Sequence, residues 1–210
     1  MPKGSVELTN ARREEIISAC EKLYQTMSFK EITLKDIAGA TSFTRTSIYN
    51  YFQTKEEIFL ALMQKEYERW VEELDALSGN YTTMSVEAFS GELARTLERR
   101  GMLLKLLSMN HFDMEANSRP ECLCEFKRAY GASIEAVRRC LNHFFPDMSP
   151  RAQQDFLYAF LPFLYGLFPY TTVSGKQRQA MADAGVQFVY MTVYDMAYSC
   201  IRALLKALMA

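Results

Sequence analysis

The sequence has few of the residue patterns that mark a metal centre or a catalytic site. Its two histidines, His111 and His143, lie far apart, and neither adjoins a serine or cysteine nucleophile motif. Cys122 and Cys124 lie two residues apart, but no second Cys or His cluster accompanies them at zinc spacing. We therefore expect no metal, no cofactor and no catalytic residues in this chain.

Long apolar runs are also missing. The longest, residues 156–170, is shorter than the ~20 residues of a membrane-spanning helix and is interrupted by Pro162, Gly166 and Pro169. No signal peptide is recognised, and we interpret the five cysteines as small buried side chains in a reducing compartment. The sequence therefore predicts a cytoplasmic protein that does not associate with membranes.

A strong positive charge is absent as well, since the formal net charge is -1. Residues 1–55 carry eight Lys or Arg and six Asp or Glu, which gives +2, and the remainder carries sixteen and nineteen, which gives -3. This distribution permits nucleic-acid binding by the N-terminal part but does not by itself indicate it.

Helical patterns dominate what is present. Apolar residues recur at spacings of three and four along most of the chain, whereas strand alternation is almost absent. Thr33, Thr44 and Thr54 are suitable helix caps. The expected N-terminal helices cover residues 10–28, 34–40, 45–52 and 55–78. Only Thr41-Ser42-Phe43 separates the second from the third, which predicts a helix-turn-helix.

The rest of the chain predicts further helices. They are expected over residues 85–100, 102–109, 120–145, 150–168 and 185–209, with a polar loop after residue 109 and a kink at Pro162. The predicted fold is all-α with about nine helices. A three-helix helix-turn-helix domain occupies residues 1–54 and a C-terminal helical bundle occupies residues 55–210.

The second helix of the helix-turn-helix exposes hydrogen-bonding groups. If Ile48, Tyr51 and Phe52 face inward, the opposite face carries Arg45, Thr46, Tyr49 and Asn50. Such a face can read base edges in a major groove. The alternative is an ordinary solvated helix surface.

Two cations stand at unusual places. Arg45 and Lys55 each occupy the first position of an expected helix, where the helix dipole disfavours positive charge. Folding does not account for this placement, whereas a nearby phosphate or guanine edge would.

The run Thr33-Leu34-Lys35-Asp36-Ile37-Ala38, then Ser47-Ile48-Tyr49-Asn50-Tyr51-Phe52, then Lys55-Glu56-Glu57 resembles the TetR family of bacterial repressors. The resemblance covers residues 10 to about 63. It implies that Thr33, Tyr49 and Lys55 contact phosphate and that Arg45, Thr46 and Asn50 face bases. With Thr44 and Ser47 these residues form the expected DNA-binding set. The family also implies a homodimer, a double-stranded DNA operator and a C-terminal effector pocket.

The C-terminal half resembles the family in layout alone. A pocket for an apolar or amphipathic small molecule, of unknown identity, is expected to draw on Met102, Leu106, Met109, Phe112, Phe126, Tyr130, Phe163 and Tyr165. Residue by residue, the sequence favours ordinary core over a pocket lining.

A dimer interface is predicted on the last helix. A stripe with alternating spacings of three and four comprises Met191, Tyr194, Tyr198, Ile201, Leu205 and Leu208. The opposite flank is apolar too, so one flank can pack on the domain while the other requires a partner. Together with the preceding apolar helix this predicts a four-helix bundle between two subunits.

Three functions remain in competition. The first is a repressor that an effector releases from DNA, and the second is an all-helical small-molecule-binding or enzymatic protein without DNA binding. The third is a regulator that binds no ligand. Intramolecular salt bridges of Arg45 and Lys55 on a closed surface would favour the second.

Overall fold

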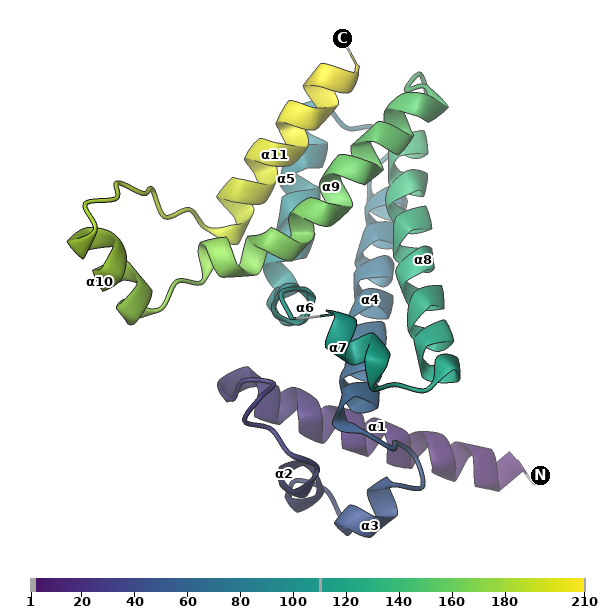
Figure 1. Ribbon diagram of the computed structural model, residues 1–210. Coiled ribbons are helices and arrows are strands. Elements are labelled where there is room, and N and C mark those ends of the chain that lie inside the picture. Colours follow the sequence, from purple (N-terminus) through teal and green to yellow (C-terminus); the bar gives the residue numbers. More distant parts are fainter. Residues whose placement is uncertain (1–2, 110, 210) are drawn as a thin grey trace. The chain divides into compact units, whose positions relative to one another are not determined.

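The computed structural model describes residues 3–109 and 111–209, and its regular structure in these residues is entirely helical (Figure 1). The helices in the first half are α1 (Lys3–Thr26), α2 (Leu34–Gly39), α3 (Arg45–Ile48), α4 (Lys55–Asn80), α5 (Val86–Arg99) and α6 (Gly101–Leu107). Those in the second half are α7 (His111–Ala116), α8 (Pro120–Phe144), α9 (Pro150–Thr171), α10 (Gly175–Asp183) and α11 (Val193–Leu208). The expected all-α class is confirmed.

The described residues divide into two compact units. The first unit falls within residues 1–66 and 110–130, and the second within 67–109 and 131–210. The helix-turn-helix therefore shares its unit with α7 and the first turns of α8, which a boundary at residue 54 does not include. The helices α4 and α8 each begin in the first unit and end in the second.

The first unit is small and is organised by helix caps. The side chain of Thr33 accepts a hydrogen bond from the amide of Asp36 while the Asp36 carboxylate accepts one from the Thr33 amide, which is a complete capping box. Thr44 caps α3 through the Ser47 amide. The core beneath these caps is formed by Ile16, Cys20, Ile32, Ile37, Ile48, Phe52, Ile58 and Phe59.

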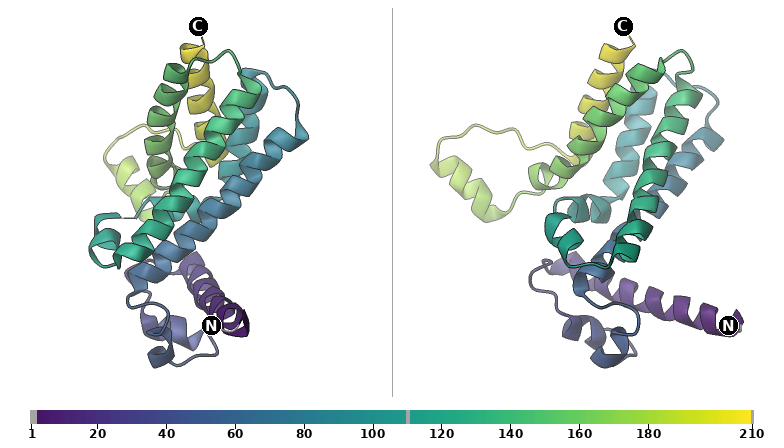
Figure 2. Two further views of the ribbon diagram at one scale, coloured as in Figure 1. Left: turned by 90° about the vertical axis from the view of Figure 1, so that its right-hand side faces the viewer. Right: turned by 45° about the vertical axis from the view of Figure 1, so that its right-hand side comes forward.

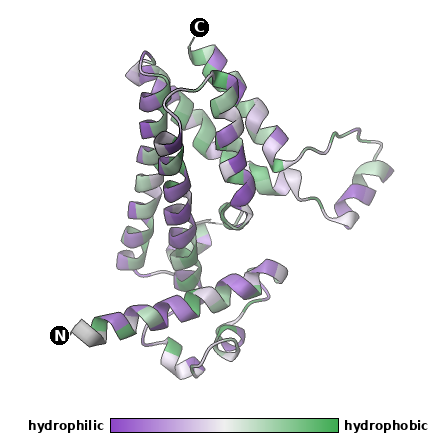
Figure 3. Cartoon of the chain, turned by 180° about the vertical axis from the view of Figure 1, so that it is seen from behind, coloured by the Kyte–Doolittle hydropathy of each residue, from purple (hydrophilic) through white to green (hydrophobic). Residues whose placement is uncertain are grey.

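The second unit has a core built on α5, α6, α9 and α11. Helix α11 packs along α5 and α9, and α6 packs on α9. A Cβ at Gly91 would lie 3.3 Å from the Tyr194 hydroxyl, which shows how closely α5 and α11 approach. The buried Trp70 donates to Thr96 at 3.0 Å, so its one polar group is satisfied. The helices carry hydrophobic and hydrophilic residues in alternating bands, as expected for elements buried on one face (Figure 3).

Several helix boundaries differ from the sequence prediction. Helix α1 begins at Lys3, earlier than expected, and α7 forms where a polar loop was predicted. The last helix begins at Val193 rather than near residue 185, and a separate helix, α10, precedes it. Eleven helices thus replace about nine in the described residues. Both additional helices are short, with six and nine residues, and helices of this length give little periodic signal.

Segment 172–192 projects from α9 and α11 within the second unit (Figures 1 and 2). Helix α10 buries none of its residues. Gly185, with φ of 66°, makes the turn that ends it, and the Val186 amide donates to the Met181 carbonyl at 3.0 Å. The polar surface of α10 explains why apolar periodicity does not reveal it.

No single helix of the described residues is long and apolar enough to cross a membrane. Only α9 and α10 taken together meet the length and composition, and they are bent by 84° at their junction. The apolar character of α9 serves the core, where Phe156, Phe160 and Leu164 are buried. All five cysteines are free, and three of them are buried.

Candidate nucleic-acid interface

The turn between α2 and α3 is closed by hydrogen bonds rather than by a glycine. The Thr41 hydroxyl donates to the Ala38 carbonyl at 3.0 Å and accepts from the Phe43 amide at 3.3 Å. The Ser42 amide donates to the Glu15 carboxylate of α1 at 2.6 Å. This bond lowers the pKa of Glu15 below its ordinary value. No described non-glycine residue has a positive φ, so serine is accommodated in this turn without strain.

The segment 45–52, here called the recognition helix, consists of α3 and the turn that extends it to Phe52. Ile48 and Phe52 are buried, and the Phe52 amide donates to the Ile48 carbonyl at 3.0 Å. The opposite face exposes Arg45, Thr46, Tyr49 and Asn50. The structure therefore brings together on one surface the four residues that the sequence placed there. This exposed face can offer a guanidinium, an amide and hydroxyl groups to the base edges in a DNA groove.

Some of the predicted contact residues already have structural roles. The hydroxyl of Thr33 donates to Asp36 at 2.6 Å, and the hydroxyls of Thr44 and Ser47 lie 2.9 Å apart. Arg45 donates from Nη2 to the Tyr49 hydroxyl at 3.3 Å, one turn along the same exposed face. Threonine caps hold the helix starts, where unpaired backbone amides attract anions.

The structure explains the position of Lys55 at the start of α4 differently from the sequence prediction. Its ammonium donates to the carbonyls of Phe29 at 2.8 Å and Ile32 at 3.1 Å, and it lies 4.2 Å from the centre of the Phe29 ring. The expectation that folding does not account for this cation is therefore wrong. Two carbonyl acceptors and an aromatic face offset the unfavourable helix dipole. The contacts of these two cations are not salt bridges, because Lys55 binds backbone carbonyls and the exposed Arg45 binds the Tyr49 hydroxyl.

Two arginines of α1 reach the recognition helix and were missed from the sequence. Arg12 donates to the Tyr51 hydroxyl at 3.2 Å, and Arg13 lies 4.7 Å from the centre of the Phe52 ring. Arg13 also pairs with Glu125 of α8 at 3.6 Å. These contacts join residues about 40 and more than 100 positions apart in the sequence. No local sequence pattern therefore predicts them.

An ion pair between buried Glu57 and half-buried Arg119 adjoins the end of the recognition helix. Glu57 is only 1% exposed, and Arg119 donates to it from Nε at 2.7 Å and from Nη2 at 2.9 Å. The amides of Gln53 and Arg119 donate to the same carboxylate at 2.8 and 3.1 Å. Burial raises the pKa of Glu57, but these hydrogen bonds outweigh it and hold the pKa below its ordinary value.

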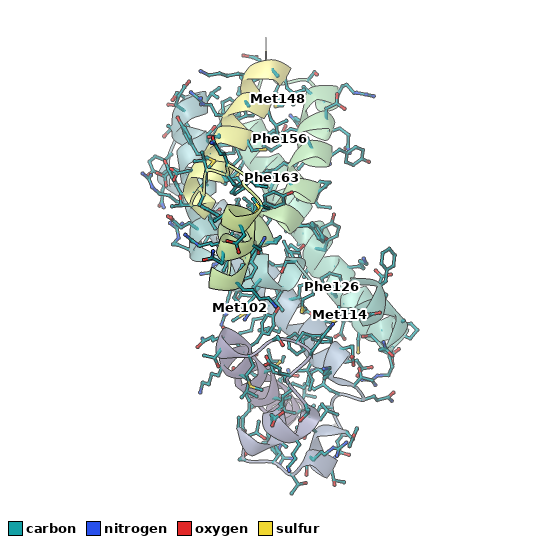
Figure 4. All side chains as sticks on the ribbon, turned by 60° about the vertical axis from the view of Figure 1, so that its left-hand side comes forward. Met102, Met114, Phe126, Met148, Phe156 and Phe163 are labelled. Carbon is teal, nitrogen blue, oxygen red and sulfur yellow. The ribbon has the colours of Figure 1, made fainter. Side chains whose placement is uncertain are left out.

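The residues expected to form one effector pocket are distributed over both units. Phe112, Phe126 and Tyr130 belong to the first, and the other five to the second. Leu106 is fully buried, whereas Phe112 on α7 is 83% exposed and does not line an enclosed cavity. Met102 comes from α6, Phe126 from α8 and Phe163 from α9 (Figure 4).

Two hollows of the second unit are lined by other residues. One, of about 280 Å³, is formed by Pro169, Tyr170, Val173, Gln177, Met181, Phe188 and Tyr190. The other, of about 590 Å³, lies along α5 and α11 and includes Gly91, Arg95, Tyr194 and Tyr198. The stacked rings of Tyr194 and Tyr198 have centres 5.9 Å apart. Aromatic and apolar surface is thus available to a small molecule.

The predicted dimer stripe on α11 requires a correction. Ile201 and Leu205 have 0% exposure within the second unit, and Tyr194 packs against Gly91 and Arg95 of α5. Tyr198 and Leu208 are half-buried. The prediction is wrong for Ile201 and Leu205, because this flank packs on the unit itself. Periodicity identified two apolar flanks but could not tell which one faces inward.

Two protein-family models match this chain. The model described as "Bacterial regulatory proteins, tetR family" matches residues 16–62, and the one described as "Tetracyclin repressor-like, C-terminal domain" matches residues 64–209. The second alone covers more than half of the chain. The chain belongs to the TetR family of bacterial regulatory proteins, as its helix-turn-helix motif suggested.

Individual relatives agree with this assignment. The chain is 26% identical over 97 residues to the HTH-type transcriptional regulator YfiR of Bacillus subtilis, which covers 46% of this chain and 47% of YfiR. It is 28% identical over 69 residues to the HTH-type transcriptional repressor Rv1474c of Mycobacterium tuberculosis, which covers 33% of this chain and 37% of that repressor. The matches thus span half or less of these relatives.

The fold is shared with solved structures. The fatty acid degradation regulator FadR from Bacillus halodurans superposes with a TM-score of 0.57 at 15% sequence identity, over 92% of this chain and 94% of that one. At this identity the likeness concerns the fold alone.

Proposed function

We propose that this protein is a DNA-binding transcriptional regulator that reads an operator through the recognition helix. The exposed face of Arg45, Thr46, Tyr49 and Asn50 carries this proposal. The helix that presents it is held by the Thr44 cap, the buried Ile48 and Phe52, and contacts from α1. A polar face on a well-fixed helix suits base-edge recognition in a major groove.

The protein acts as a homodimer in this proposal. A single recognition helix reads only a few base pairs, and two-fold pairing places a second one over another half-site. The outer surfaces of α9 and α11 are the favoured interface, since Tyr158 is 73% exposed and Ala203 and Ala207 are exposed beside half-buried Leu204. This replaces the Ile201 flank with its opposite.

In this proposal the protein is a repressor that a small molecule releases from its operator. The effector is apolar or amphipathic, because one hollow of the second unit is lined mainly by aromatic and apolar side chains and the other combines aromatic rings with Glu87, Glu92 and Arg95. Linkage requires that it prefer the conformation that DNA does not bind.

Selection of bound fragments from random DNA with the purified protein tests the first two claims together. We expect an enriched sequence with two-fold symmetry whose half-sites are about one helical turn apart. Enrichment of a single asymmetric half-site would contradict the dimer claim. No enrichment at all would contradict the DNA-binding claim and favour the small-molecule-binding alternative.

Sedimentation tests the interface directly. Tyr158→Glu with Ala203→Glu places charges on the proposed interface, and we expect a folded monomer that no longer binds operator. Glu98→Arg on the exposed face of α5 is the control and should remain dimeric. A dimeric double variant would place the interface elsewhere.

A screen of apolar and amphipathic compounds tests the effector. A true effector raises the melting temperature of the protein and lowers its affinity for operator. Compounds that stabilise the protein without changing DNA binding would argue against an effector that releases it from DNA.

A further inference from the structure

The Glu57 carboxylate joins three backbone segments that are distant in sequence. It accepts from the Gln53 amide just after the recognition helix, and from the Arg119 amide just before α8. The carbonyl of Arg119 accepts from the Leu123 amide at 3.2 Å, so Arg119 is the first residue of that helix's hydrogen-bond ladder. One buried carboxylate thus satisfies amides at the starts of both α4 and α8.

The Arg119 side chain completes the connection. Its Nε and Nη2 form a two-pronged contact with Glu57, and Nη2 also lies 3.4 Å from the Tyr51 carbonyl in the last turn of the recognition helix. A neighbouring bond strengthens the link, because the Thr54 hydroxyl donates to the Asn117 carbonyl at 2.9 Å. The end of the recognition helix is therefore tied to residues 117–119 at several points.

We propose that Arg119 and Glu57 are positioning residues for DNA recognition, through which the start of α8 fixes the C-terminal turn of the recognition helix. This inference rests on the proposed DNA-binding function. Glu57 is too buried to touch DNA, so its effect on binding must pass through the backbone it holds.

The geometry predicts which part of DNA recognition depends on the pair. Arg119 holds Tyr51, which adjoins Asn50, whereas Arg45 at the other end of the helix is held by the Thr44 cap. Loss of the pair should relax base preference at the positions read by Asn50 and leave those read by Arg45 unchanged. A merely destabilised protein would lose both together.

The experiment compares four variants in the random-DNA selection and in operator titrations far below the melting temperature. Arg119→Lys keeps the charge but loses the two-pronged contact, and Glu57→Gln keeps the size but loses the charge. We expect each to weaken operator binding about 2- to 30-fold, the range for residues that couple sites without touching the ligand. Asn50→Ala and Arg45→Ala identify the base positions that each reads.

A double-mutant cycle separates positioning from direct contact. Arg119 is 33% exposed at its side chain, so it could instead bind a phosphate. In that case Arg119→Lys would retain affinity, Glu57→Gln would have no effect on binding, and the inference is overturned. Positioning predicts that the double variant binds no worse than either single variant, with an unchanged salt dependence.

Control variants and separate outcomes distinguish failure of the positioning role from failure of the proposed function. Glu115→Gln and Lys127→Gln break an exposed ion pair of the same unit, 3.2 Å apart, and should leave binding unchanged. If the wild-type protein enriches no DNA, the proposed function fails. If it does, and Arg119→Lys relaxes no position or relaxes those of Arg45 equally, only the positioning role fails. Should Glu57→Gln fail to fold, Arg119→Lys alone decides through its pattern of relaxed positions.

Discussion

The candidate sites of the two units are built in different ways. In the first unit, four exposed polar residues lie within one six-residue segment of the recognition helix: Arg45, Thr46, Tyr49 and Asn50. The second exposes large apolar side chains far apart in sequence, such as Tyr158 at 73% and Val189 at 81%. A site made of residues close in the sequence can be predicted from a sequence pattern. A site that packing assembles from distant residues cannot.

The first prediction tests the inward flank of α11. Ile201→Asp should destabilise the second unit by at least about 3 kcal/mol, because it buries a charge without a partner. Ser199→Asp, on the exposed flank of the same helix, should cost little. Denaturant titration followed by Trp70 fluorescence measures both. Equal stability of the two variants would mean that the flanks have been assigned wrongly.

The second prediction tests the polar surface of the first unit. Arg45→Ala should weaken operator binding by about 1 to 3 kcal/mol and relax preference at one base pair in each half-site. Its exposed side chain makes only the contact with Tyr49 among the interactions described above, so stability should hardly change. Selected-sequence profiles of the two proteins provide the measurement. An unchanged profile would exclude Arg45 from base recognition.

The third prediction concerns Lys55. The structure shows its ammonium bound to backbone carbonyls, whereas the family resemblance implies a phosphate contact. Lys55→Ala should cost about 1 kcal/mol of stability through the lost bonds to the Phe29 and Ile32 carbonyls. If the ammonium also serves phosphate, as the family resemblance implies, all DNA sequences weaken alike and the salt slope falls by about 1. Thermal melts and titrations at several salt concentrations separate the two effects. A sequence-selective loss would contradict the phosphate role.

The fourth and most gradual effect is acid sensitivity. Hydrogen bonds from backbone amides hold the pKa of Glu15 and Glu31 below their ordinary values, and hydrogen bonds from Thr33 do so for Asp36. The pKa of Glu57 is lowered despite burial. A carboxyl whose pKa is lowered in the folded protein stabilises the fold at pH values above its ordinary pKa, which is 4.5 for the glutamates and 3.8 for Asp36. That stability is lost as the pH falls through the lowered pKa.

In the second unit, a hydrogen bond from Lys206 lowers the pKa of Glu87. We therefore expect the first unit to lose amide protection before the second as the pH falls below about 4.5. Hydrogen exchange resolved by segment measures this, and Glu57→Gln should reduce the difference. Simultaneous loss in both units would contradict it.

The sequence by itself determined the all-α class, the helix-turn-helix and the exposed recognition face, because caps and apolar spacing are local and specify helix starts and faces directly. Only the tertiary structure decided what lies behind that face. Glu57 reads as an ordinary residue in the first turn of a helix, and its partner Arg119 lies 62 positions away. It likewise decided that Lys55 binds carbonyls and that Ile201 points inward, since periodicity gives the faces of a helix but not what each face meets.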